Sequence, residues 1–200
     1  MSCPVTIGLD FDNTIVCYDK AIRELAKKHF DLPARVKTKT EIKTYISNLH
    51  GNLAWTKFQG ELYGPGMHFA EPYAGSIETI FKLSLSGFRI LILSHRSRYP
   101  YAGYKYDLHE YAVKWLDQKL RYQGNMVIKK DSIFFFETKL EKILAITEQG
   151  CDYFLDDLPE IINNENFPKN TTGFLFDPNK TFTIKDGCIN NWLDLTRILL

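Results

Sequence analysis

Short apolar runs alternate with amphipathic stretches along most of this chain. Runs rich in β-branched and aromatic residues predict strands at residues 5–11, 88–94, 132–136, 153–155 and 172–176. After them, apolar residues recur with the period of a helix at 75–86, 106–122, 139–149 and 191–200. This alternation is typical of a parallel sheet with helices on both faces. The predicted fold class is therefore α/β, with a three-layer core.

The segment from about residue 15 to residue 72 does not follow this alternation. Its apolar periods and its Pro and Gly breaks predict helices at 19–30, 40–49 and 52–63. We expect residues 16–71 to form a small helical domain, inserted into a core made of residues 1–15 and 72–200. The alternative is a helical hairpin that only covers one edge of the sheet.

Two carboxylates follow the first predicted strand directly. Asp10 and Asp12 are two positions apart, so they would emerge on the same face at the carboxyl end of the strand. Open α/β sheets bind their ligands at that end. At about 4 Å, with an effective dielectric constant near 20, the repulsion of the pair would cost roughly 4 kcal/mol. Such a pair fits a bound cation or a proton transfer, and it fits equally well an acidic turn capped by Asn13 and Thr14, so this pair alone does not decide between them.

A second acidic pair follows the strand predicted at 153–155. Asp156 and Asp157 lie between this strand and Pro159, where a helix is predicted to begin. Asp157 could serve as the N-cap of that helix, with Pro159 in its first turn. Capping needs one acid and not two, which favours a chemical role for the pair.

Polar residues also end the other strands. Ser94 closes the second predicted strand, and His95 and Arg96 follow it, so all three are expected to border the same site. Lys139 opens the next helix, and Lys142 lies one turn further along it. Of the two lysines, Lys139 is better placed to reach back to the strand ends, because it lies at the start of the helix. Taken alone, however, the pattern favours a solvated lysine on the helix face.

The sequence resembles the haloacid dehalogenase-like (HAD) hydrolase superfamily. Its four motifs match, in chain order, Asp10-Phe11-Asp12-Asn13-Thr14, Ser94, Lys139 and Asp156-Asp157. The resemblance covers roughly residues 4–15 and 72–178 and implies a Rossmann-like core. In this superfamily an insertion after the first motif forms a cap over the active site, so residues 16–71 are expected to be a small helical cap.

The resemblance also implies catalytic and metal-binding roles for the acidic residues. Asp10 would be the nucleophile, forming an aspartyl phosphate, and Asp12 the general acid and base. Mg²⁺ would be held by Asp10, by Asp12 through its backbone carbonyl, and by Asp156 and Asp157.

The same resemblance implies a phosphate-binding set. Ser94 and Lys139 would bind the phosphoryl oxygens, and the lysine would neutralise charge that the metal does not cover. His95 and Arg96 are expected beside them. From its residue type, Arg96 could recognise a second phosphate or a carboxylate of the substrate, or equally it could be a loop arginine paired with an acid of the chain.

Asp12 separates two chemistries within the superfamily. Its dehalogenases resemble its phosphatases but lack an acid at this position, since a halide needs no proton to leave. The sequence therefore favours a magnesium-dependent phosphomonoester hydrolase, acting on a small phosphorylated metabolite or nucleotide. A phosphotransferase or mutase, and a catalytically idle relative that binds a phosphorylated ligand, stay open as alternatives.

Composition and charge argue against some classes of binding partner. A net charge of +1 supplies no field that would draw the chain to nucleic acid or to an anionic membrane, and the apolar runs are too short to span a bilayer. The N-terminus lacks the pattern of a signal peptide. The four cysteines, Cys3, Cys17, Cys151 and Cys188, have no metal or disulfide spacing. We expect a cytoplasmic protein with a small phosphorylated substrate, no nucleic-acid or membrane partner, and no protein partner implied.

Overall fold

The computed structural model describes residues 4–182 and 187–200, so Cys3 lies outside the described residues. The chain forms two compact units. The sheet unit consists of Met1–Val16, Pro72–Arg96 and Leu120–Leu200, and the helical unit of Cys17–Glu71 and Ser97–Lys119. The expected division placed 97–119 with the core; in the structure this segment is part of the helical unit.

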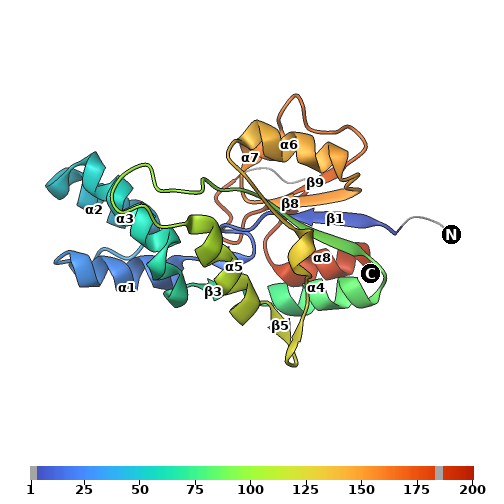
Figure 1. Cartoon of the computed structure of the whole chain (residues 1–200), viewed down its shortest axis with the longest axis horizontal. Helices are drawn as coiled ribbons and strands as arrows, with labels where there is room; N and C mark the ends of the chain where they lie inside the picture. Colours follow the sequence, from blue (N-terminus) through green and yellow to red (C-terminus); the bar gives the residue numbers. More distant parts are fainter. Residues whose placement is uncertain (1–3, 183–186) are drawn as a thin grey trace. The chain divides into compact units, whose positions relative to one another are not determined.

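A six-stranded parallel sheet forms the centre of the sheet unit (Figure 1), in the order β10-β9-β8-β1-β4-β7. Its strands are β1 (Thr6–Leu9), β4 (Arg89–His95), β7 (Ile133–Phe136), β8 (Tyr153–Asp156), β9 (Thr172–Phe176) and β10 (Cys188–Ile189). Leu9 of β1 lies opposite Ile92 of β4 and Leu155 of β8. The predicted α/β fold class is confirmed, and only the two-residue β10 was not predicted among these strands.

Helices cover both faces of this sheet. Figure 1 shows α4 (Ser76–Leu85) and α8 (Trp192–Leu199) on one face, and α6 (Lys139–Glu148) and α7 (Pro159–Ile162) on the other. A capping box formed by Thr138 and Glu141 fixes the start of α6. The N-cap of α7 is Leu158, which corrects the expected capping role of Asp157.

The helix predicted at 106–122 is shorter in the structure. It becomes α5 (Leu108–Lys119), and the next residues form a hairpin of β5 (Arg121–Tyr122) and β6 (Asn125–Met126). Gln123 and Gly124 make the turn with φ angles of 50° and 83°, a conformation that glycine adopts without strain. Tyr122 stacks on Phe81 of α4 with ring centroids 4.6 Å apart, so aromatic packing holds the hairpin on the sheet unit.

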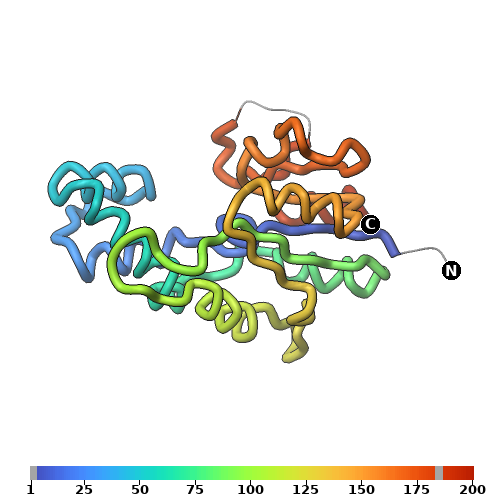
Figure 2. Tube along the Cα trace, turned by 45° about the horizontal axis from the view of Figure 1, so that its top comes forward, coloured from blue at the N-terminus to red at the C-terminus, as the bar shows by residue number. Residues whose placement is uncertain are grey.

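The helical unit contains α1 (Asp19–His29), α2 (Lys39–His50), α3 (Asn52–Tyr63), the 3₁₀ turn η1 (Pro65–Phe69) and α5. Figure 2 shows the blue-to-teal helices of the insertion together with the yellow-green α5. The Trp115 indole of α5 donates to the carbonyl of Ala70 (3.0 Å), and Lys119 pairs with Glu71 (2.9 Å). These contacts explain why 97–119 joins the insertion. Two short strands, β2 (Val16–Cys17) and β3 (Glu71–Pro72), pair with each other.

In the part of the chain that the structure describes, no helix combines the length and the apolar character needed to cross a bilayer.

One core cluster links β4, β8 and α6. Leu91 and Leu93 of β4 pack in it with Ile143 and Ile146 of α6 and with Phe154 of β8, all of them buried. Because the cluster is filled, strand and helix are held at a fixed separation.

The packing of Gly8 against this cluster yields a prediction. A Cβ at Gly8 would lie 2.5 Å from Cδ2 of the buried Phe154 ring and 3.0 Å from the Cys151 sulfur. Gly8→Ala should therefore lower the free energy of unfolding by about 2 kcal/mol, seen as a Tm lower by roughly 4–8 °C. Thermal unfolding should show a smaller loss for Gly8→Ala in a Phe154→Leu background. An equal loss in both backgrounds would contradict this explanation.

Candidate active site

The sheet topology brings three carboxylates together. From β1 the chain proceeds to β4 and β7 on one side, whereas β8, β9 and β10 lie on the other, so the strand order reverses between β1 and β8. The carboxyl ends beside such a switch point are the ligand-binding crevice of open α/β sheets. Asp10 directly follows β1, and Asp156 and Asp157 are the last residue of β8 and its successor.

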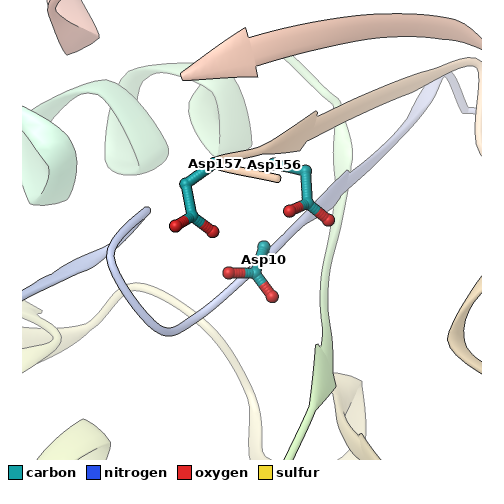
Figure 3. Close-up of side chains that lie close together, drawn as sticks. All are labelled: Asp10, Asp156 and Asp157. Carbon is teal, nitrogen blue, oxygen red and sulfur yellow. The ribbon is translucent and has the colours of Figure 1, made fainter. Parts of the chain in front are cut away.

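Figure 3 shows these three side chains pointing toward one another. Asp10, Asp156 and Asp157 each place a carboxylate oxygen within 4.8 Å of the others. Asp10 is 4 % exposed and Asp156 is fully buried. Two backbone hydrogen bonds fix them: the amide of Asp10 donates to the carbonyl of Leu155, and the amide of Leu158 donates to Oδ1 of Asp156, both at 2.9 Å.

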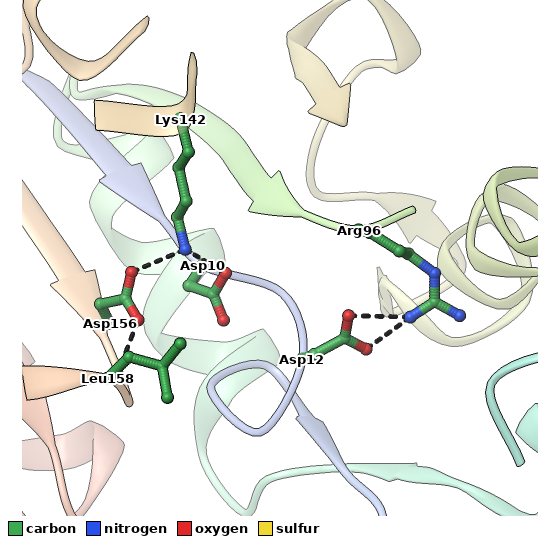
Figure 4. Close-up of polar contacts among 6 residues, drawn as sticks. All are labelled: Asp10, Asp12, Arg96, Lys142, Asp156 and Leu158. Carbon is green, nitrogen blue, oxygen red and sulfur yellow. Dashed lines mark hydrogen bonds and ion pairs between the residues drawn. The ribbon is translucent and has the colours of Figure 1, made fainter. Parts of the chain in front are cut away.

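A buried lysine lies among the carboxylates. Nζ of Lys142 is 2.5 Å from Oδ1 of Asp10 and 2.6 Å from Oδ2 of Asp156 (Figure 4), and its side chain is 1 % exposed. The Lys142 ammonium also lies 5.5 Å from the ring centroid of Phe154. One ammonium therefore joins the residue after β1 to the end of β8.

This position corrects the choice of Lys139. Lys139 is 45 % exposed and its ammonium pairs with Glu160 at 2.6 Å. The capping box makes Lys139 the first residue of α6, whereas Lys142 lies about 4.5 Å further along the helix axis. A sequence signal for Lys142 did exist: it falls among the apolar residues Ile143 and Ile146 of the buried face, where a charge is costly unless it is paired.

The cluster shifts the proton affinities of its members. Burial raises the pKa of Asp10 well above its usual value; Lys142 opposes this shift, and the carboxylates of Asp156 and Asp157 add to it. Burial alone would lower the pKa of Lys142, but its attraction to Asp10 and Asp156 outweighs burial and places that pKa above its ordinary value. The lysine therefore stays charged.

Asp12 points away from this cluster. Nη1 of Arg96 donates to both of its carboxylate oxygens, at 2.6 and 2.8 Å (Figure 4). The expectation that Asp10 and Asp12 emerge on one face is corrected, because β1 ends at Leu9 and the strand alternation does not continue. The loop instead turns through Asn13, whose φ is +60°.

Ser94 and His95 end β4 at the same edge of the sheet. The Ser94 hydroxyl is fully buried, and within the described residues it has no hydrogen-bond partner. A buried hydroxyl left in this state is costly, so it is available to a ligand. Burial lowers the pKa of the His95 imidazole, and the charge of Lys142 lowers it further, which keeps this ring neutral near pH 7.

The donor set fits a hard divalent cation. Three carboxylates face one ammonium, so the fully ionised cluster keeps a formal charge of −2. Oxygen ligands of this kind are those that Mg²⁺ prefers in proteins. Asp10, Asp156 and Asp157 would hold the ion; the carboxylate of Asp12 pairs with Arg96 instead.

Several solved structures have this fold. A haloacid dehalogenase-like hydrolase from Streptococcus pneumoniae matches with a TM-score of 0.65 and 11 % identity, covering 98 % of this chain and 99 % of that chain. YfnB from Bacillus subtilis, described as a HAD hydrolase bound to magnesium, matches with a TM-score of 0.62 and 14 % identity, covering 99 % of each chain. A HAD phosphatase from Thermococcus onnurineus matches with a TM-score of 0.58 and 17 % identity, covering 98 % of this chain and 97 % of that chain.

No protein-family model and no curated protein sequence matches the chain. Structures described as dehalogenases are also among the structural matches. At these identities the likeness establishes the fold. The chain has the fold of the HAD hydrolase superfamily, as its motifs led us to expect.

The two lysines of α6 provide a matched test of the cluster. In metal-free buffer, Lys142→Met should lower the free energy of unfolding by about 3 kcal/mol, because it leaves buried carboxylates without a counter-charge. Lys139→Met removes only an exposed ion pair and should cost less than about 1 kcal/mol. Urea unfolding with EDTA at pH 7 measures both. Equal losses would show that Lys142 is not the residue that neutralises the cluster.

Proposed function

We propose that this protein is a magnesium-dependent phosphomonoester hydrolase that acts through an aspartyl phosphate. The observation that supports it most is the meeting of Asp10 with Asp156, Asp157 and Lys142 at the switch point of the sheet. A nucleophilic carboxylate, a cation site and a buried ammonium are the groups that phosphoryl transfer requires.

Asp10 is the proposed nucleophile. Its carboxylate attacks phosphorus, the bond to the leaving oxygen breaks, and the phosphoryl group becomes attached to Asp10. Two anions repel, and a bound Mg²⁺ supplies the charge neutralisation that lets them approach. Water then releases phosphate and restores the carboxylate.

Lys142 and Ser94 are the proposed phosphate ligands of the protein. The Lys142 ammonium lies against Asp10 and can pair with a phosphoryl oxygen bonded there. The unpartnered hydroxyl of Ser94 can donate to another oxygen. His95, which follows Ser94 in β4, is the proposed neighbour of this phosphate site, and its neutral imidazole would add no charge there.

Asp12 is the proposed general acid and base. It would protonate the leaving oxygen and later deprotonate the attacking water. The carboxylate lies outside the three-carboxylate cluster, which suits a group that serves the leaving oxygen. The backbone carbonyl of Asp12 remains the proposed fourth protein ligand of the metal. An acid here favours phosphate esters over organohalides as substrates.

The helical unit is the proposed cap, and selects a small phosphorylated metabolite or nucleotide. The chain passes into this unit at Cys17, soon after the first motif, and again at Ser97, directly after Arg96. At both points the helical unit is joined through the backbone to residues of the site. We further propose a cytoplasmic location, with no nucleic-acid or membrane partner.

The first test is phosphate release. With Mg²⁺, the protein should hydrolyse p-nitrophenyl phosphate, and Asp10→Asn should lower the rate by at least about 10³-fold because no phosphoenzyme can form. Asp31→Asn, at an exposed position of the helical unit, is the control and should keep the rate. A wild-type protein that hydrolyses no member of a phosphoester panel would refute the proposal.

The second test is metal binding. Mg²⁺ at ten times its Kd should stabilise the folded protein by about 1.4 kcal/mol, which raises Tm by roughly 3–6 °C relative to EDTA. Asp156→Asn should abolish the rise, and Asp31→Asn should retain it. Differential scanning calorimetry gives the comparison; identical curves with Mg²⁺ and EDTA would count against the metal site.

A further inference from the structure

The Arg96 guanidinium is a second buried cation of the sheet unit. Its side chain is 3 % exposed, and it pairs with the Asp12 carboxylate, which is 20 % exposed. One nitrogen, Nη1, reaches both oxygens of Asp12. The pair therefore fixes the direction of that carboxylate.

Arg96 is itself held firmly in place. Its backbone amide donates to the carbonyl of Phe136 (2.9 Å), which extends the β4–β7 pairing by one residue. Its guanidinium lies 5.7 Å from the ring centroid of Phe11, and that ring meets Phe135 edge-on with centroids 6.3 Å apart. A backbone anchor and an aromatic face together restrict the guanidinium to one position.

Two buried cations thus divide the acids of the first motif. Lys142 pairs with Asp10 and with Asp156, and Arg96 pairs with Asp12 (Figure 4). Asp12 is only two residues from Asp10 on a turning loop, so without Arg96 its carboxylate could move toward the metal cluster. There it would compete for the cation and leave the departing oxygen without a proton donor.

We propose that Arg96 is a positioning residue that holds the Asp12 carboxylate away from the metal cluster and directed at the leaving oxygen. The proposal rests on the proposed phosphatase function and deepens it. Its consequence is selective: substrates that need protonation of the leaving oxygen depend on Arg96, and substrates with a good leaving group do not.

The experiment uses a series of substituted phenyl phosphates. Because kcat/KM reports the steps up to phosphoryl transfer, it isolates the proton donation. For Arg96→Met, kcat/KM should fall by about 10- to 100-fold on phenyl phosphate and by less than about 3-fold on p-nitrophenyl phosphate. The plot of log kcat/KM against the pKa of the leaving phenol becomes steeper. Arg96→Lys keeps a buried charge for folding and should recover part of the loss.

Two comparisons separate positioning from general damage. In an Asp12→Asn background, Arg96→Met should cause no further loss on phenyl phosphate, since the group it positions is already disabled. Arg89→Met is the matched control, because Arg89 begins the same strand and its guanidinium donates to Gln149, at the end of β4 opposite to Arg96. It should leave the slope unchanged.

Three outcomes would overturn the proposal. Equal losses on both phenyl phosphates would show a general structural role for Arg96, and so would losses that add to those of Asp12→Asn. An unchanged slope in Arg96→Met with full activity would show that Asp12 needs no such support. In each of these results the wild type is active, whereas a wild type inactive on the whole series would refute the phosphatase function itself.

Discussion

The buried ammonium of Lys142 between Asp10 and Asp156 is the interaction on which the site depends. Each carboxylate pair at about 4 Å repels by roughly 4 kcal/mol at an effective dielectric constant near 20. Without a cation the ends of β1 and β8 could not both carry acids at this burial. The ammonium reaches them only if α6 packs on β4 and β8 through Ile143 and Ile146. Core packing and site electrostatics are therefore one constraint.

The sequence alone could predict part of this arrangement of strands and charged residues. Local patterns identified the main strands and the acids at their ends, because strand alternation and the polar residues that follow each strand lie within a few positions of each other. Parallel pairing then required Asp10 and Asp156 to meet. The choice between Lys139 and Lys142 depended on where the Thr138 cap starts the helix. Lys139, in the first turn, is exposed to solvent, whereas Lys142, one turn further along, lies in the carboxylate cluster.

Other features depended on tertiary partners that no local pattern reveals. The helix predicted at 106–122 carries the apolar period of a core helix, but the Trp115 indole and Lys119 bind Ala70 and Glu71 of the insertion. The direction of the Asp12 side chain also depends on a tertiary partner. Strand alternation predicts that it shares a face with Asp10. In the structure, Arg96, which is 84 positions away in the sequence, binds the Asp12 carboxylate and turns it away from Asp10.

The fold alone does not select a reaction, since structures described as phosphatases and as dehalogenases both share it at low identity. The three carboxylates and Lys142 suit attack by Asp10 in either chemistry. What differs is the leaving group: a halide departs as it is, whereas an alkoxide needs a proton. In the mechanism proposed above, only the second case uses the Asp12 carboxylate that Arg96 holds. The substitution of one buried arginine therefore bears on which chemistry this chain performs.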